Sequence, residues 1–357
     1  MEKILKCEIC DGSEWKIIEN YEYSKDEIFS IKKNLKYNFF YYFRLISRIL
    51  ILSRPRNYIV KGYPRNKYQL SRFEVLFNVW NKNLNKIRLT SVYCKKCGFC
   101  TYSPRPTKLD IEAKYNFLIK NSFDYNLKKK YSYKDLTKLD IERAKSIYIK
   151  CKKYKNNLNF KNLNVLDFGG GIGSNLINFI NQNNTCSLID FNKDNLPGIK
   201  NIGDDIDDLE ADQKFDVIIC SHVLEHVSNL NFIVSKLKSH LNNDGIIYVE
   251  VPLEIKAGLS IETDPITHIN FFNKNSLVNL FLINRYKLLG YKEEILPHTS
   301  TYINAMWLIA QNDNNNSFCM LRNDISKNLY PNKFLILYKI IYLYLKNLKL
   351  KLNNIFN

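Results

Sequence analysis

The sequence lacks the features that would place the protein in a membrane or outside the cell. No stretch reaches the roughly 18 uninterrupted apolar residues expected of a membrane-spanning helix. The first residues, MEKILKCEIC, carry charges and no apolar run long enough for a secretory signal peptide. Internal repeats and long low-complexity linkers are also missing. We therefore expect a cytoplasmic protein, and leave contact with the inner membrane face open.

Acidic residues are scarce relative to basic ones. The 357 residues include 53 Lys and Arg against 35 Asp and Glu, which gives a net charge of +18. This balance favours anionic partners such as nucleic acid, anionic lipid or phosphorylated substrates, although solvated surface lysines explain it equally well. Residues 31–96 and 332–351 are strongly basic, whereas 203–216 are acidic. The basic excess therefore lies mostly outside the region that carries the chemical motifs below.

The nine cysteines do not form the pattern of a disulfide framework. Four of them form two C-x-x-C pairs, Cys7 with Cys10 and Cys94 with Cys97, and a glycine follows the second pair. Four thiolates in tetrahedral geometry suit structural zinc, so the pairs predict a zinc module with a long insertion between its two knuckles. Because Cys100 makes a second, overlapping C-x-x-C with Cys97, the fourth ligand stays open between these two.

Residues 163–310 alternate short apolar runs with amphipathic segments. This alternation, with strands that are apolar throughout, predicts a parallel sheet covered by helices on both faces. The runs expected to be strands are 165–168, 186–190, 215–220 and 245–251. The segments expected to be helices are 173–182, 229–242 and 275–289.

The rest of the chain divides into three further regions. Residues 1–106 form the cysteine module, with a basic aromatic insertion at about 16–90. Within that insertion, Phe39–Leu52 predicts a buried or interfacial helix. Residues 107–160 predict a helical connector, and we expect the catalytic domain at 161–312. The basic, apolar tail at 313–357 predicts a helix that packs on the body or lies on a membrane surface.

A glycine-rich loop is the strongest local signal. In VLDFGGGIG, residues 165–173, an apolar strand runs into D-x-G-x-G-x-G before a helical pattern. Glycines let the backbone turn sharply and approach a ligand, and a helix N-terminus adds N–H groups. Asp167, two residues before the first loop glycine, suits a ligand with a cationic amino group. Asp190, at the end of the next strand, can accept hydrogen bonds from both ribose hydroxyls.

In order and spacing, the segments VLDFGGGIGSNL, SLID, KFDVIICSHVLEHVSN and LNNDGIIYVEVP resemble the class I S-adenosylmethionine-dependent methyltransferases. The resemblance implies an α/β fold with a Rossmann-like, doubly wound sheet of seven strands, joined here to a small N-terminal zinc module and helical insertions. The last strand of such a sheet runs antiparallel. Residues 291–297 and 302–310 are expected to supply the closing hairpin.

The resemblance also implies a cofactor site for S-adenosylmethionine. Asp190 would hold the ribose, and Ser221 and His222 would lie beside the methionine part. An acidic residue after the third strand would contact adenine, and GDDIDDL offers Asp204 or Asp205 in an open register. The residues predicted to bind the cofactor are Asp167, Gly169, Gly171, Gly173, Asp190, Asp205 and Ser221.

Three histidines are candidates for the chemistry of methyl transfer, because a hydroxyl acceptor benefits from a general base. If a helix begins near Val223, His222 and His226 are four residues apart and share one face. His268, in THINFFN, resembles the H-x-x-F-F stretches that cap the acceptor pocket in sugar and small-molecule methyltransferases. The H-x-x-x-H spacing also suits a metal, but no third ligand has a clear position.

A four-cysteine module ahead of this domain resembles bacterial methyltransferases of deoxysugar and surface-polysaccharide pathways. It implies a saccharide or other small-molecule acceptor, and we expect O-methylation of a saccharide or nucleotide-sugar in surface glycan biosynthesis, with structural zinc. An RNA methyltransferase is one alternative, although neither an N/D-P-P-Y/F tetrad nor a catalytic cysteine motif is present. A sugar C-methyltransferase is another, although such enzymes carry a long third domain after the core.

Overall fold

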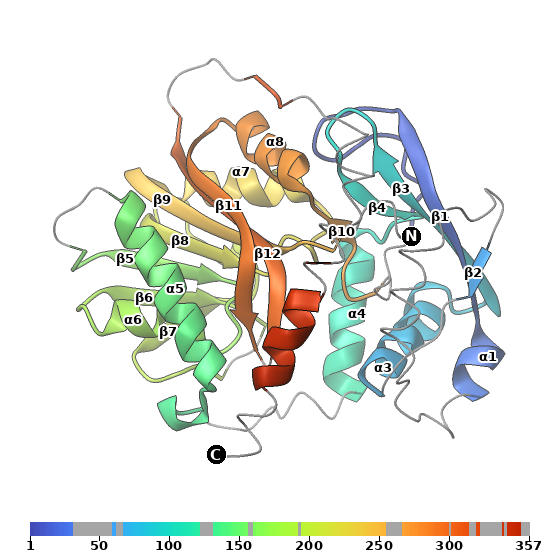
Figure 1. Ribbon diagram of the computed structural model, residues 1–357, viewed down its shortest axis with the longest axis horizontal. Coiled ribbons are helices and arrows are strands. Elements are labelled where there is room, and N and C mark those ends of the chain that lie inside the picture. Colours follow the sequence, from blue (N-terminus) through green and yellow to red (C-terminus); the bar gives the residue numbers. More distant parts are fainter. Residues whose placement is uncertain are drawn as a thin grey trace.

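The structure, a computed structural model, contains two β-sheets with helices packed around them (Figure 1). The helix expected at Phe39–Leu52 lies outside the described residues. The residues that the structure describes are 1–30, 59–61, 67–121, 131–155, 160–191, 194–254, 266–299, 301–313, 319–321, 338 and 341–350.

The larger sheet has seven strands within the described part of the chain, in the order β11-β12-β9-β8-β5-β6-β7. Strands β5 to β9 run parallel, and β12 runs antiparallel to both neighbours. This arrangement confirms the predicted doubly wound fold and its closing hairpin. The strands are β5 Asn164–Phe168, β6 Thr185–Ile189, β7 Ile199–Gly203, β8 Phe215–Ser221, β9 Leu241–Pro252, β11 Tyr286–His298 and β12 Thr301–Asn312.

Alternate residues of the central strands point into two separate cores. On one face, Ile218 of β8 packs with helices α7 (Leu230–Ser239) and α8 (Lys274–Ile283). On the other face, Val217 packs with α5 (Lys138–Tyr154) and the short α6 (Ile177–Ile180). Because both faces are covered, the strands are apolar at successive positions, which is the pattern that the sequence displays.

The three predicted helices of this region are shorter than expected, and the one predicted at 229–242 spans only Leu230–Ser239. The one predicted at 275–289 ends at Ile283, because Arg285 adopts a left-handed φ of 59° and turns the chain into β11. The apolar residues after this turn belong to the hairpin strand β11. They continued the helical pattern in the sequence, so the predicted helix was too long. The segment predicted at 173–182 consists of a 3-10 turn, Ser174–Leu176, followed by α6.

The second sheet joins the N-terminal region to the part of the chain that forms the large sheet. Its five strands, counted over the described residues, have the order β10-β4-β3-β1-β2. Strand β10 follows β9 in the chain and pairs antiparallel with β4 of the N-terminal region. In Figure 1 it therefore lies between the two sheets. The strands are β1 Trp15–Ser24, β2 Ile59–Lys61, β3 Lys86–Cys94, β4 Cys100–Ser103 and β10 Asn270–Phe271.

Helices complete the N-terminal region and its junction. The connector carries α4 and α5, as its periodicity predicts, and α5 covers the large sheet. Buried aromatic residues of the helices and the second sheet, such as Phe77, Tyr93 and Phe271, form a third core. The remaining helical segments are α1 Lys25–Ser30, α3 Lys67–Val75, a π-helical turn at Leu76–Trp80 and α4 Lys108–Asn121.

Part of the tail is helical, at residues 341–350. Asn347 fastens it to the sheet edge: its Oδ1 accepts from the Tyr302 N–H at 2.8 Å, and its Nδ2 donates to the Tyr302 carbonyl at 3.0 Å. Tyr342 and Leu345 remain 48% and 55% exposed, so contact with a membrane surface stays a prediction. Among the described residues, no helix has the length and apolarity needed to cross a bilayer.

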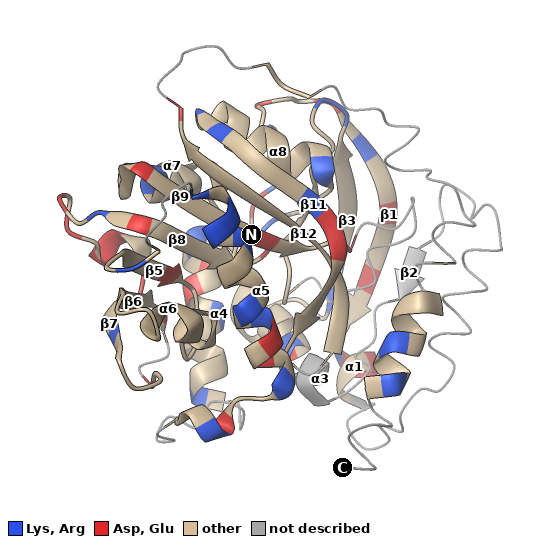
Figure 2. Cartoon of the chain, turned by 60° about the vertical axis from the view of Figure 1, so that its left-hand side comes forward, with Lys and Arg blue, Asp and Glu red and all other residues tan. Residues whose placement is uncertain are grey.

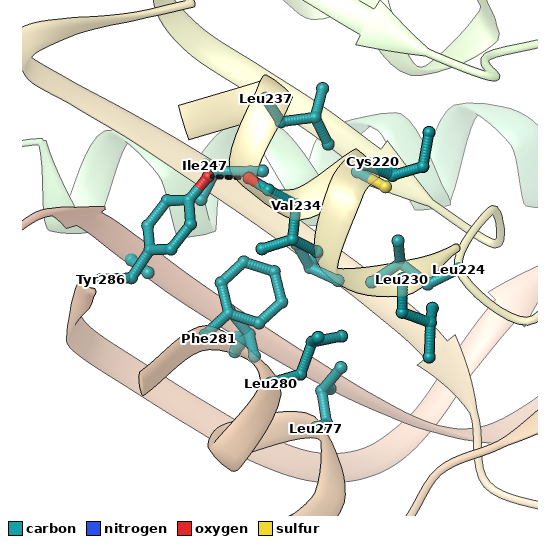
Figure 3. Close-up of a cluster of buried hydrophobic side chains, with 14 of the residues drawn as sticks. Cys220, Leu224, Leu230, Val234, Leu237, Ile247, Leu277, Leu280, Phe281 and Tyr286 are labelled. Atoms are coloured by element: carbon teal, nitrogen blue, oxygen red, sulfur yellow. Dashed lines mark hydrogen bonds between the residues drawn. The ribbon is translucent and has the colours of Figure 1, made fainter. Parts of the chain in front are cut away.

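The core between α7 and α8 offers a stability test (Figure 3). Phe281 is fully buried beside Tyr286, whose hydroxyl donates to the Val234 carbonyl at 3.0 Å. We expect Phe281→Ala to lower the free energy of unfolding by ~3–5 kcal/mol through the cavity it leaves. Tyr286→Phe, which keeps the ring and loses one hydrogen bond, should cost only ~1 kcal/mol. Urea denaturation measures both, and equal losses would contradict this packing.

Candidate active site

The glycine loop leaves β5 and turns at the carboxyl edge of the sheet. Gly169 and Gly171 both adopt left-handed φ angles, 69° and 61°. A Cβ on Gly169 would lie 2.5 Å from the Val223 side chain, so the loop after β8 packs directly against the glycine loop. A Cβ on Gly171 would meet no described residue within 4 Å. Gly171 therefore faces open space, which is what a backbone that approaches a ligand requires.

Two predicted carboxylates flank this loop. Asp190 directly follows β6, and its Oδ2 accepts from the Gly171 N–H at 2.8 Å, so it holds the loop in place. Asp167 is fully buried under the loop and accepts from Asn175 Nδ2 at 3.1 Å. Burial raises the pKa of Asp167 to about 7, although the Asn175 hydrogen bond and the Arg143 charge oppose the shift. The Asp167 carboxyl is therefore only partly ionised near pH 7, and an approaching cation favours its carboxylate form.

The other predicted cofactor residues also lie at this edge or in the loop. Gly173, with φ of 80°, packs on Ile199 of β7. Asp205 caps the turn after β7, since its Oδ1 accepts from the Ile206 N–H at 2.7 Å. The N–H of Asp204 donates to an aspartate later in the same turn. Which of the two acidic residues contacts adenine stays a prediction.

Arg143 is a site residue that the sequence did not predict. It comes from α5, donates from Nη2 to Ser221 Oγ at 2.6 Å and lies 3.6 Å from Glu250 Oε1. Its Nε is buried without a hydrogen-bond partner among the described residues. The guanidinium thus adds positive charge beside Ser221, where the methionine part of the cofactor was predicted. A lone arginine in a helical pattern gives no sequence signal for this position.

His222 is held between two buried carboxylates. Its Nδ1 lies 3.1 Å from Glu225 Oε1, and its Nε2 lies 2.9 Å from Glu250 Oε1. Burial and the Arg143 charge lower the pKa of His222, but hydrogen bonds to the two carboxylates outweigh them and raise it overall. Burial alone would raise the pKa of Glu250, yet the His222 hydrogen bond and Arg143 lower it to about 2. Both ring nitrogens of His222 are therefore engaged in an internal ion cluster.

The expected pairing of His222 with His226 on one helical face is wrong. The α-helix after β8 begins only at Leu230, capped by Asn229, and the chain between them forms turns. His222 adopts a left-handed φ of 58°, which prevents a helix from starting there. The two imidazoles consequently point toward different partners.

His226 instead lies against His268, with ring centroids 4.8 Å apart. His226 Nδ1 is 2.6 Å from the Thr267 carbonyl, and His268 Nδ1 is 2.7 Å from Glu254 Oε2. Burial lowers the pKa of His226 to about 3, so the ring is neutral near pH 7. The side chains of His226 and His268 are 25% and 18% exposed, so both reach solvent beside the loop that packs on the glycines.

The four predicted zinc ligands converge in the N-terminal region. The sulfur atoms of Cys7 and Cys97 are 3.5 Å apart, as are those of Cys10 and Cys94, and all four lie within 4.8 Å of one another. A tetrahedron with ~2.3 Å zinc–sulfur bonds has edges of ~3.8 Å. These separations exceed a disulfide bond, so the geometry fits a zinc ion.

The two knuckles have the same backbone shape. Asp11 and Gly98, which follow the second cysteine of each pair, adopt left-handed φ angles of 54° and 83°. Their N–H groups donate to the carbonyls of Cys7 and Cys94, each at 2.9 Å. Cys100 lies outside the four-sulfur group, at the start of β4, where it packs in the aromatic core.

The cysteine module contacts the segments that carry the two histidines. Arg105 is buried and donates from Nη2 to Glu8 Oε2 at 2.9 Å and to the Val227 carbonyl at 3.2 Å. The Thr101 hydroxyl donates to the Ile269 carbonyl at 2.8 Å. Val227 directly follows His226, and Ile269 directly follows His268. The module therefore helps to set the separation of these imidazoles.

A family model described as a methyltransferase domain matches residues 142–284. This range contains the glycine loop, Asp190, Ser221 and the paired imidazoles. Residues 142–284 thus match a methyltransferase domain. The match begins within α5, so the helix that supplies Arg143 belongs to the methyltransferase domain. None of the curated proteins compared with this chain matches it in sequence.

Several solved methyltransferase structures are similar to the domain. An S-adenosylmethionine-dependent methyltransferase from Methanosarcina mazei is 16% identical and has a TM-score of 0.36, with 43% of this chain and 93% of that chain covered. The 1,6-didemethyltoxoflavin-N1-methyltransferase of Burkholderia thailandensis is 12% identical, with a TM-score of 0.45 and coverages of 63% and 96%. The magnesium protoporphyrin IX methyltransferase of Synechocystis is 13% identical, with a TM-score of 0.38 and coverages of 57% and 97%.

The raised pKa of Asp167 predicts how cofactor binding depends on pH. In the free protein the carboxyl keeps its proton up to about pH 7, whereas the nearby ammonium of the predicted ligand favours the carboxylate. Binding therefore releases a proton, and affinity falls as the pH drops through 7. Between pH 8 and pH 6 we expect about a tenfold loss of affinity for S-adenosylhomocysteine, measured by calorimetry. Asp167→Asn should remove this slope, and a wild-type affinity that is equal at both pH values would contradict it.

Proposed function

We propose that the domain transfers the methyl group of S-adenosylmethionine to a hydroxyl of a saccharide or nucleotide-sugar in surface glycan biosynthesis. The observation that carries this proposal is the pair of partly exposed imidazoles, His226 and His268, beside the loop that packs on Gly169. Neutral imidazoles suit the orientation of a neutral hydroxyl nucleophile. The resemblance of the four-cysteine module and of THINFFN to bacterial sugar methyltransferases supports the choice of acceptor.

The cofactor would lie across the carboxyl ends of β5, β6, β7 and β8. Asp167 lies beneath the glycine loop, where its negative charge attracts the ammonium group, and Asp190 accepts from the ribose. Arg143 and Ser221 lie where its methionine carboxylate would sit, and a guanidinium is well suited to bind a carboxylate. When bound, the sulfonium supplies an activated methyl group. The chain's own residues orient the acceptor oxygen in line with the carbon–sulfur bond, which breaks with its electron pair on sulfur.

Structural zinc is part of the same proposal. The sulfur separations fit a tetrahedral thiolate site formed by Cys7, Cys10, Cys94 and Cys97. Zinc there would cross-link the two knuckles, which are far apart in the sequence. Through Arg105 it would support the segment that carries His226.

An RNA acceptor is the main alternative, and the net charge of +18 is the observation in its favour. On α5, however, basic and acidic residues alternate in the first turns (Figure 2), although its last turn carries lysines alone. A nucleic-acid site usually groups its basic residues on one face. Methylation at a sugar carbon is a further alternative, and product analysis separates it from O-methylation.

Cofactor binding is tested first, with the full-length protein and S-adenosylhomocysteine. We expect Asp190→Ala to weaken binding about 10- to 100-fold, because charge-assisted hydrogen bonds contribute ~1.5–3 kcal/mol. Asp212→Ala, an exposed carboxylate on the same domain, is the matched control and should bind normally. Unchanged affinity in Asp190→Ala would refute the cofactor site.

Acceptor identity is tested in the same experiment series with a panel of nucleotide-sugars, glycans and RNA. Mass spectrometry of the products should show a methyl ether on a sugar oxygen, and His268→Ala should lower kcat by roughly 10²- to 10⁴-fold. Methylation of RNA alone, or of a sugar carbon, would replace the proposed acceptor and leave the methyltransferase assignment standing.

The zinc site makes a separate prediction that uses two neighbouring cysteines. We expect one zinc per chain by elemental analysis, and loss of that zinc in Cys97→Ser, with a lower midpoint of thermal unfolding because structural zinc contributes folding energy. Cys100→Ser should retain the metal, since Cys100 lies outside the four-sulfur group. The reverse pattern, with zinc kept by Cys97→Ser and lost by Cys100→Ser, would show that the ligand set is wrong.

A further inference from the structure

A second group of potential metal ligands lies at the acceptor side of the domain. Glu225, His226 and His268 each offer one ligand atom, and these atoms lie within 4.8 Å of one another. The group lies far from the four cysteines in the sequence, and it offers oxygen and nitrogen ligands in place of sulfur. Its residues come from two segments, the turn after β8 and the loop before β10, so their proximity depends on the fold.

Glu225 carries an unexplained oxygen. The residue is only 1% exposed, and Oε1 is engaged by His222 Nδ1 at 3.1 Å. Oε2 is buried and has no hydrogen-bond partner among the described residues. An unsatisfied buried carboxylate oxygen costs free energy, so its retention beside two imidazoles indicates that a positively charged or donating ligand belongs there.

The two imidazoles are oriented as metal-binding histidines usually are. His226 Nδ1 faces the Thr267 carbonyl and His268 Nδ1 faces the Glu254 carboxylate, and both of these partners only accept hydrogen bonds. Each Nδ1 therefore carries the proton, which makes Nε2 the accepting nitrogen of each ring. Histidines that ligate metals typically donate their other N–H to a carbonyl or carboxylate in this way.

The local charge is compatible with a cation. Lys114, a buried ammonium that donates to the Ile266 carbonyl at 3.0 Å, acts on His226 electrostatically and opposes a metal. The surrounding carboxylates Glu225, Glu250 and Glu254 face the basic groups Lys114, Arg143 and His222. These charges balance, so they do not repel a cation.

We propose that Glu225, His226 and His268 bind a divalent first-row transition-metal cation through one carboxylate oxygen and two Nε2 atoms. Three protein ligands leave positions open for oxygen ligands, as in other sites built from two histidines and a carboxylate. We assign these open positions to neighbouring hydroxyls of the sugar acceptor, and this assignment rests on the proposed function. The imidazoles then orient the acceptor through the cation.

A bound cation also explains how a weakly acidic hydroxyl becomes a nucleophile. Coordination lowers the pKa of the acceptor hydroxyl, which releases its proton to solvent water. The resulting alkoxide oxygen forms a bond to the methyl carbon as the carbon–sulfur bond breaks. The electron pair of that bond stays on sulfur, and the products are the methyl ether and S-adenosylhomocysteine.

The test uses Mn²⁺ alone, added to the full-length protein with its thiolate site loaded with zinc. Mn²⁺ prefers oxygen and nitrogen ligands, so it should not displace zinc from four sulfurs. Electron paramagnetic resonance measures the Mn²⁺ that stays unbound. The difference from the amount added should correspond to one bound ion per chain. His268→Ala should abolish this binding, and Glu254→Gln, which alters only the partner of a ligand, should weaken it about 10- to 100-fold. His240→Gln, a histidine bonded to a backbone carbonyl elsewhere, should bind normally.

Binding of S-adenosylhomocysteine is measured on every variant, which shows that each one folds and separates the two hypotheses. Wild-type protein that leaves Mn²⁺ unbound, or His268→Ala that binds it as tightly as wild type, overturns the metal site. The methyltransferase proposal survives either result as long as S-adenosylhomocysteine binding depends on Asp190. If Asp190→Ala binds S-adenosylhomocysteine as tightly as wild type, the cofactor site is overturned. A measured stoichiometry of one Mn²⁺ per chain would still support the metal site.

Discussion

The ion cluster of His222, Glu225 and Glu250 is the constraint on which the site depends. All three side chains are buried and contact one another, and Arg143 and the Tyr248 hydroxyl also contact Glu250. Breaking such a buried cluster leaves an uncompensated charge and costs ~3–5 kcal/mol. The cluster ties the end of β8 to β9, because the His222 N–H also donates to the Glu250 carbonyl at 2.8 Å. It thereby fixes the turn that carries His226.

The same turn is held from its other side by the N-terminal region. Asn270, in β10, donates from Nδ2 to the carbonyls of Leu224 and Val227, each at 2.7 Å. Because β10 pairs with β4, the sheet of the cysteine module continues into the methyltransferase domain. A module that shares a sheet and a buried arginine with the catalytic domain acts as a structural support of the acceptor side.

The two halves of the proposed reaction meet at Val223. On one side of this residue lies Gly169 and the predicted cofactor site, and on the other the turn leads within three residues to His226. The donor side consists of backbone and carboxylates, which suit a nucleoside with a cationic amino group. The acceptor side consists of imidazoles and one buried carboxylate, which suit a hydroxyl or a metal ion. A methyltransferase needs both chemistries within reach of one carbon atom.

The sequence by itself determined the features that depend on local pattern. VLDFGGGIG predicted β5 and its loop, the apolar strands predicted a doubly covered sheet, and the two C-x-x-C pairs predicted a four-cysteine site, because each signal lies within a few residues. Tertiary structure alone decided which distant groups meet. Arg143 and Ser221 are far apart in the sequence, as are Glu225 and His268, and no repeating pattern links the members of either pair. Their contacts therefore depend on the fold. The pairing of His222 with His226, which required a helix start near Val223, failed for the same reason: His222 is left-handed and is held by two buried carboxylates.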